Sequence, residues 1–140
     1  MKLFSDSFPD GDALPASGNP QLSWSEVPAG VSALALLCLD ADAPADFFLW
    51  SVVDIPPAMS SICADHRLPL RQGLNDFHTV GYHGPLPPPN GTHHYIFRIY
   101  ALDVPQLALP PRFTGADVVN AIYGHIVDEA QLIGTYTRTW

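Results

Sequence analysis

Residues 93–102 read HHYIFRIYAL and carry the strongest strand signal in the chain. Aromatic and β-branched side chains dominate this stretch, and they pack well on the pleated surface of a sheet. Two similar segments precede it: VSALALLCL at 31–39, and FFLWSVVDI at 47–55, which stops at Pro56-Pro57. The nearly continuous apolar run of 31–39 is typical of a strand buried on both faces. We therefore expect these three segments to be central strands.

Proline-rich segments surround the three strands. The chain of 140 residues contains 15 prolines, and only 14% of its residues are charged. Proline is excluded from helix interiors and from central strands. Residues 1–30 therefore indicate a turn-rich edge with one or two short strands, and residues 56–92 indicate mostly loop. Because this length is usual for one domain, we expect a single domain over residues 1–140.

One helix is expected near the C-terminus, within residues 115–130. Thr114 and Asp117 have the spacing of a capping box. Apolar residues recur after them at helical spacing, and this stripe should face inward: Val118, Val119, Ile122, Tyr123, Ile126 and Val127. The tail QLIGTYTRTW should form a last strand or a packed extension. Together these elements predict a mainly β fold, an antiparallel β-sandwich with one principal C-terminal helix docked at its end.

Charge and composition exclude several functional classes. Fourteen acidic residues against six basic ones give a net charge of −8, which would repel the phosphates of a nucleic acid. No stretch approaches the roughly 20 apolar residues of a membrane span, and the N-terminal MKLFSDSFPDGD turns polar too early for a signal peptide. We therefore expect a cytoplasmic protein with no membrane span, in which Cys38 and Cys63 remain thiols.

Motifs of catalysis and metal binding are missing from the sequence. No G-x-S-x-G elbow occurs, and neither cysteine has a partner at metal-ligand spacing. His93 and His94 are adjacent on a predicted strand and so point to opposite faces. We expect a protein that is not an enzyme and holds no metal and no cofactor.

Polar side chains stand at the ends of two predicted strands. Asp40 and Asp42 are two residues apart, as are His93 and Tyr95, so while the chain is extended each pair shares one face. If these strand ends are neighbours, all four side chains converge in one small cavity and His94 turns away. A carboxylate bonded to one imidazole nitrogen fixes the tautomer and leaves the other nitrogen for a ligand. The alternative is that Asp-x-Asp before a proline forms only a turn or cap.

The motifs around these residues resemble those of the phosphatidylethanolamine-binding protein family. DADAP at 40–44 is similar to the family's D-P-D-A-P box, and GYHGPLPPPNGTHHYIFRIYALD at 81–103 is similar to its second box. Further segments at 19–24, 75–77 and 132–136 look like the bacterial, Raf-kinase-inhibitor-like branch. The resemblance covers nearly the whole chain in the right order.

This resemblance implies a sandwich of antiparallel sheets with a small pocket for phosphate-type anions, phospholipid head groups included, and no general catalytic activity. The positions that match the family's pocket and its rim are Asp40, Asp42, Pro44, Gly84, Pro87, Pro88, His93 and Tyr95. Two positions depart from the pattern. Ala41 replaces a proline, and Leu49 replaces a second pocket histidine. Losing one charge-assisted hydrogen bond costs on the order of 1.5–3 kcal/mol, roughly a factor of ten to a hundred in affinity.

The sequence therefore predicts a non-catalytic protein that binds a small anionic ligand, phosphate or a phospholipid head group, in a pocket weakened by Leu49. The alternative is a protein-interaction module, like a kinase or protease inhibitor, in which the pocket is vestigial and the loops of 56–92 are the contact surface. A protein partner and a homodimer both remain open.

Overall fold

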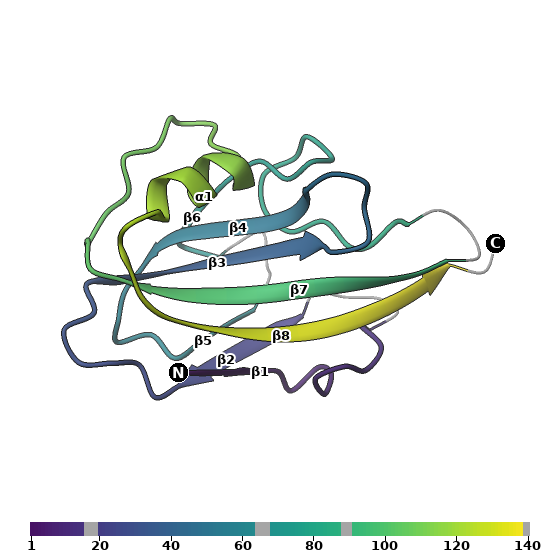
Figure 1. Ribbon diagram of the computed structural model, residues 1–140, viewed down its shortest axis with the longest axis horizontal. Coiled ribbons are helices and arrows are strands. Elements are labelled where there is room, and N and C mark those ends of the chain that lie inside the picture. The colour runs from purple at the N-terminus through teal and green to yellow at the C-terminus, as the bar shows by residue number, and fades with distance from the viewer. Residues whose placement is uncertain (16–19, 64–67, 88–90, 139–140) are drawn as a thin grey trace.

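Antiparallel strands form two sheets, and one short helix lies outside the larger of them (Figure 1). The computed structural model describes all residues except 16–19, 64–67, 88–90 and 139–140. In chain order the elements are β1 (Lys2–Phe4), β2 (Gln21–Ser25), β3 (Ala33–Asp40), β4 (Phe47–Ile55), β5 (Ser61–Cys63), β6 (Arg71–Gln72), β7 (Gly91–Leu102), α1 (Gly115–Ile122) and β8 (Ile126–Arg138).

The larger sheet has the strand order β6-β4-β3-β7-β8, and the smaller one has the order β1-β2-β5. All neighbouring strands in both sheets are antiparallel. The three segments predicted as central strands are β3, β4 and β7, and they occupy the three inner positions of the larger sheet. The predicted antiparallel, mainly β fold is therefore confirmed. Two short strands, β5 and β6, interrupt the segment that was expected to be mostly loop.

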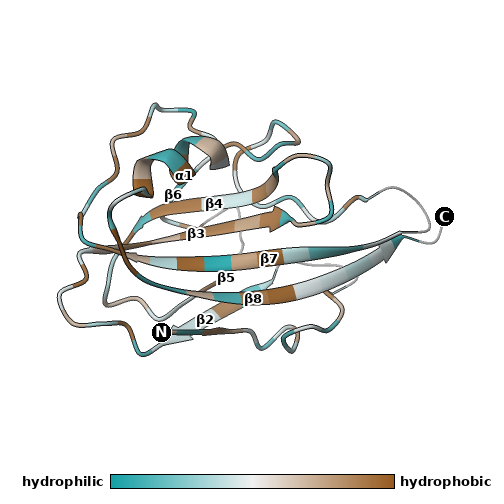
Figure 2. Cartoon of the chain, in the orientation of Figure 1, coloured by the Kyte–Doolittle hydropathy of each residue, from teal (hydrophilic) through white to brown (hydrophobic). Residues whose placement is uncertain are grey.

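Both faces of the larger sheet are covered, which explains the unbroken apolar run of β3. Its residues are all buried except the half-buried Leu39, and Figure 2 shows β3 in brown up to its polar tip. Between the two sheets lies one core, which includes Trp24, Leu36 and Phe97. A second core, with Leu37 and Phe113, lies between the larger sheet and α1. The helix thus covers an outer face of the sandwich, which corrects the prediction that it docks at the end.

The predicted helix over 115–130 is about half right. Its capping box is present, because Thr114 accepts from the Asp117 N–H and the Asp117 carboxylate accepts from the Thr114 N–H. The helix nevertheless ends at Ile122, and Gly124 has a positive φ of 83°. Beyond this turn the chain pairs with β7 over 13 residues as β8. Tertiary strand pairing therefore overrides the helical spacing of the last apolar residues.

The inward stripe predicted for the helix is likewise only partly correct. Val118 and Ile122 are buried against the sheet, whereas four of its six residues are exposed: Val119, Tyr123, Ile126 and Val127. In the part of the chain that is described, no helix is long and apolar enough to cross a membrane.

Candidate functional site

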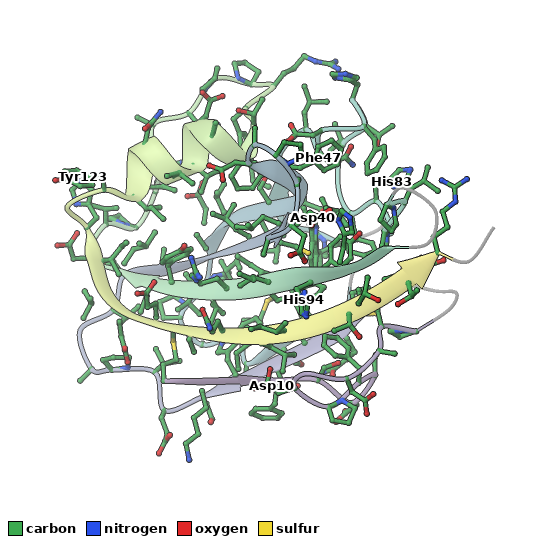
Figure 3. All side chains as sticks on the ribbon, turned by 45° about the vertical axis from the view of Figure 1, so that its right-hand side comes forward. Asp10, Asp40, Phe47, His83, His94 and Tyr123 are labelled. Carbon is green, nitrogen blue, oxygen red and sulfur yellow. The ribbon has the colours of Figure 1, made fainter. Side chains whose placement is uncertain are left out.

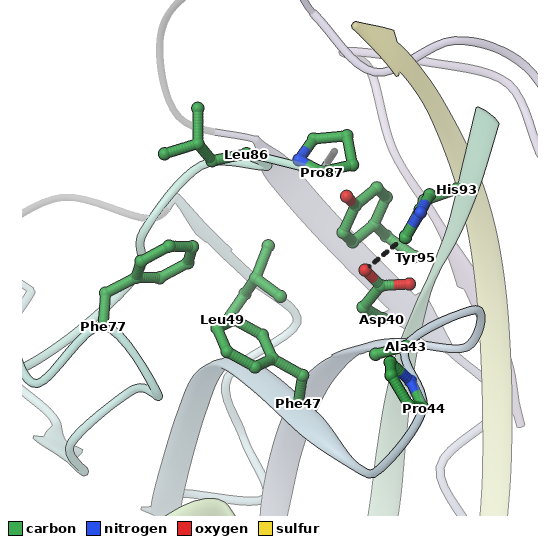
Figure 4. Close-up of a pocket in the computed structure, with 10 residues that line it drawn as sticks. All are labelled: Asp40, Ala43, Pro44, Phe47, Leu49, Phe77, Leu86, Pro87, His93 and Tyr95. Carbon is green, nitrogen blue, oxygen red and sulfur yellow. Dashed lines mark hydrogen bonds and ion pairs between the residues drawn. The ribbon is translucent and has the colours of Figure 1, made fainter. Parts of the chain in front are cut away.

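A cavity of about 180 Å³ lies where β3 ends and β7 begins (Figure 4). Its lining consists of Asp40, Ala43, Pro44, Phe47, Leu49, Phe77, Leu86, Pro87, His93 and Tyr95. Three of these side chains, from Asp40, His93 and Tyr95, are polar and lie together on one side. The rest of the lining is apolar. The cavity can therefore offer hydrogen bonds at one end and van der Waals contact over the remaining wall.

Strand register brings the polar side chains together. β3 and β7 run antiparallel with Asp40 opposite Tyr95, so the end of one strand meets the start of the other. One further ladder bond follows, from the Ala41 N–H to the His94 carbonyl, with a nitrogen–oxygen distance of 2.8 Å. A proline at position 41 lacks the N–H and could not make this bond. Alanine at this position, where the resemblance implies a proline, therefore allows a backbone contact beside the cavity.

Asp40 and His93 form a short, nearly buried pair. The His93 Nδ1 lies 2.6 Å from the Asp40 Oδ2, and the two side chains are only 15% and 8% exposed. The second carboxylate oxygen, Oδ1, accepts from the Asp42 N–H at 2.9 Å. Because an ionised carboxylate only accepts, the His93 Nδ1 carries the proton and donates. The imidazole is fixed in orientation, and its Nε2 remains for a ligand.

Tyr95 adds a hydroxyl to the same side of the cavity. It follows His93 by two residues on β7, so both side chains face the cavity (Figure 4). The residue is 1% exposed, and within the described residues its hydroxyl makes no hydrogen bond. Burial raises the pKa of Tyr95 well above its usual value, and the charge of Asp40 raises it further. The phenol is therefore protonated at neutral pH and can donate to a ligand.

Asp42 does not join this group, which corrects the prediction that four side chains converge. Its carboxylate accepts from the His94 backbone N–H at 2.6 Å and from the His94 Nδ1 at 2.8 Å. Both hydrogen bonds lower the pKa of Asp42, and the bond from the His94 side chain has the larger effect. The strand ends at Asp40 and a turn begins at Ala41, so the alternation that would align Asp40 with Asp42 no longer applies. His94 does turn away from the cavity, as predicted.

Leu49 enters the cavity wall through a β-bulge. Cys38 pairs with Trp50 and Leu39 pairs with Phe48, so Leu49 is the extra residue of β4. A bulge redirects side chains that strict alternation would send to opposite faces. Leu49 and Trp50 accordingly both contribute to the core between the sheets, while Phe48 contributes to the core under α1. Leu49 is 1% exposed and lines the cavity close to the Asp40–His93 pair.

The opposite wall comes from the loop after β6. Asn75 is buried, and its side-chain amide bonds to Thr79 and Gly81, which fixes a tight turn that carries Phe77. The Phe77 ring meets Phe47 edge-on, with 5.0 Å between ring centroids. Sequence reasoning assigned no site role to four of the lining residues: Ala43, Phe47, Phe77 and Leu86. Ala43, Phe77 and Leu86 did have a signal, because they belong to the segments 40–44, 75–77 and 81–103 that resemble the family.

The loop is also tied to β4 beside Leu49. The Asp76 carboxylate accepts from the Phe48 N–H at 2.7 Å, and the Asp76 N–H donates to the Phe48 carbonyl at 2.8 Å. The His83 N–H in turn donates to the Leu49 carbonyl at 3.0 Å. The loop wall is thus anchored to β4 by two backbone hydrogen bonds and by the bond to the Asp76 carboxylate.

The remaining predicted rim residues have different placements. Pro44 and Pro87 line the cavity. Gly84 does not line it, and its carbonyl accepts from the His83 Nδ1 at 2.7 Å. Pro88 lies outside the described residues. Among those that are described, no three histidine, cysteine or acidic side chains converge to hold a metal ion.

Comparison with known proteins agrees with the fold and with the motifs. The family model for phosphatidylethanolamine-binding protein matches residues 4–137. A UPF0098 protein of Methanothermobacter thermautotrophicus is 40% identical and covers 99% of this chain and of its own length. The UPF0098 protein YbhB of Escherichia coli is 31% identical over 98% of this chain and 100% of its own. The crystal structure of Escherichia coli YbcL, described as a new member of the mammalian PEBP family, has a TM-score of 0.89 at 26% identity and covers 97% of both chains.

The chain is an antiparallel sandwich with a pocket at the junction of β3 and β7, and the family model matches most of its length. These observations define the class of protein. The chain belongs to the phosphatidylethanolamine-binding protein family.

Proposed function

We propose that the protein is a non-catalytic binding protein whose cavity takes a small ligand with an anionic head, a phosphate or a phospholipid head group. The observation that carries this proposal is the Asp40–His93 pair at 2.6 Å beside the unbonded hydroxyl of Tyr95. With Nδ1 committed to Asp40, a protonated His93 presents Nε2–H to the cavity. This group and the Tyr95 hydroxyl are two donors on one side of the cavity, a suitable arrangement for an anion.

The same geometry limits the affinity. Among the described lining residues His93 is the only group that can be cationic, and Asp40 already offsets its charge. Leu49 contributes no donor. We therefore expect weak binding of a bare anion.

The chemistry of the lining supports a binding role over catalysis. The described lining residues include no serine, threonine or cysteine to act as a nucleophile. The only hydroxyl is that of Tyr95, and burial raises its pKa and keeps it protonated. We take these polar groups as hydrogen-bond partners for a ligand.

The proposal is tested by an NMR titration with inorganic phosphate and with phosphoethanolamine at pH 6. We expect saturable shifts of the His93 imidazole signals. Tyr95→Phe should weaken binding about tenfold, since it removes one hydrogen bond to a charged group. Tyr100→Phe is the matched control, because Tyr100 is also buried on β7 but belongs to the core under α1. Shifts confined to other histidines, or equal effects of the two variants, would contradict the proposal.

A further inference from the structure

The cavity is larger than an inorganic anion requires, and most of its wall is apolar. The cavity measures about 180 Å³, and an apolar protein cavity of about 150 Å³ is known to accept benzene. The side chains of Phe47, Leu49, Phe77 and Leu86 make up most of the wall opposite the polar groups (Figure 4). The space therefore fits one ring-sized apolar group next to a small polar head.

The apolar wall is held in place before any ligand binds. The Phe77 ring stacks on His83 with 3.7 Å between centroids and an angle of 20° between planes, and it meets Phe47 edge-on. Asn75 fixes the turn beneath Phe77 through four hydrogen bonds. A wall that is ordered in the free protein loses little entropy on binding, so contact with it adds to affinity.

The polar end sets the charge of the head. The Asp40 carboxylate lies at the cavity and is hydrogen-bonded to the only imidazole there. A second negative charge on the ligand would face this carboxylate and the Leu49 side chain with no further cation among the described lining residues to offset it. A carboxylate, with one charge and two acceptor oxygens, matches the two donors from His93 and Tyr95.

We propose that the cavity selects aromatic monocarboxylates, with the carboxylate at His93 and Tyr95 and the ring against Leu49, Phe77 and Leu86. This inference rests on the anion site of the proposed function and goes beyond it, because it adds a second class of ligand that binds the same site more tightly than a bare phosphate does. The specificity-determining residues are Leu49 and Leu86, since the aliphatic side chain of each would contact the ring of the ligand. Only two donors of the protein bind the head, so most of the affinity comes from contact of the ring with the apolar wall.

Benzoate, acetate and inorganic phosphate are the probes. Isothermal titration calorimetry at pH 6 measures their affinities, and the NMR signals of the His93 imidazole report whether each binds at the cavity. Benzoate and acetate have the same carboxylate head, so the ratio of their affinities measures what the contact of the ring contributes. We expect benzoate to bind about tenfold or more tightly than acetate and than phosphate.

Leu86→Ala tests the wall with little danger to the fold, because Leu86 is 53% exposed. It should weaken benzoate about three- to tenfold and change acetate by less than about twofold. Val80→Ala is the matched control, since Val80 is 64% exposed in the same loop and does not line the cavity. It should leave all three affinities unchanged.

The outcomes separate this inference from the proposed function. If acetate or phosphate binds as tightly as benzoate and shifts His93, the ring contact is wrong and the anion site stands. If Leu86→Ala and Val80→Ala have the same effect on benzoate, the ring lies elsewhere and the inference fails. If none of the three probes binds at His93, both proposals are overturned.

Discussion

Leu49→His introduces the donor that the resemblance to the family implies for this position. Leu49 is 1% exposed, and the bulge of β4 directs it into the cavity that Asp40 and His93 also line. An imidazole at this position would offer a second cationic donor to an anion held at His93. We expect the variant to bind inorganic phosphate more tightly than the wild type does.

The magnitude follows from one added charge-assisted hydrogen bond, about 1.5–3 kcal/mol, which corresponds to a tenfold to hundredfold gain in affinity. The gain should be larger at pH 6 than at pH 8, because an introduced imidazole with its ordinary pKa of about 6.5 is cationic at the lower pH. Placing a polar ring in an apolar wall should also lower the free energy of unfolding by about 1–3 kcal/mol.

Calorimetric titration with phosphate at pH 6 and pH 8 measures the effect, and thermal unfolding confirms that the variant is folded. Tyr123→His is the matched control, since it introduces the same imidazole at a side chain that is 86% exposed. Figure 3 shows Tyr123 at the left edge of the molecule, with Asp40 near the middle and His83 further to the right. If a folded Leu49→His binds phosphate no better than the wild type and the control do at either pH, Leu49 does not adjoin the bound anion, and the reasoning fails.

Three further predictions concern stability and reactivity. His94 lowers the pKa of Asp42, so this carboxylate contributes stability above its unfolded pKa of about 3.9 and loses it as the pH falls through the lower folded pKa. Asp42→Asn should therefore lower the free energy of unfolding at pH 7 by no more than about 1 kcal/mol for so exposed a pair, seen as a lower Tm, and a deficit that grows on acidification would contradict this. Gly115→Ala should lower Tm although alanine favours a helix by about 1 kcal/mol, because the added methyl would overlap the Phe48 ring at a cost of about 1–3 kcal/mol; a higher Tm would show that the ring yields. Burial, with a smaller effect of Asp40, raises the pKa of the Cys38 thiol well above its usual range, whereas Cys63 is exposed. Iodoacetamide at pH 8 should therefore modify one cysteine of the native protein and both after denaturation, and labelling of Cys38 in the native state would refute the assigned burial.

Local sequence patterns were sufficient for the strands that cross the centre of the larger sheet. The unbroken apolar run of β3 and the aromatic stretch of β4 reflect burial on both faces, and the aromatic and β-branched residues of β7 are typical of a strand with one more exposed face, so composition alone indicates all three. The helix boundary could not be found this way. Ile126 and Val127 fit the helical spacing and equally fit a strand, and only the presence of β7 as a pairing partner decides between the two.

Some residues of the site could likewise be predicted from the sequence, and others could not. His93 and Tyr95 lie inside a regular strand, where alternation predicts their common face correctly. Asp42 lies just past the end of β3, where the turn has already begun and alternation does not hold. Leu49 enters the wall through a bulge that no glycine or proline marks in FFLWSVVDI. Phe77 and Leu86 come from a loop whose turn is fixed by local hydrogen bonds of Asn75. The loop reaches the cavity through the bond from the His83 N–H to the Leu49 carbonyl, which joins distant parts of the chain and cannot be inferred from spacing.

The most direct test of the proposed ligand site is a crystal structure of the protein grown with phosphoethanolamine. Our account predicts the phosphate group in the cavity, with oxygens within hydrogen-bond distance of the His93 Nε2 and the Tyr95 hydroxyl, and with the His93 Nδ1 still on Asp40. A phosphate bound on another surface while the cavity holds only water would contradict the account.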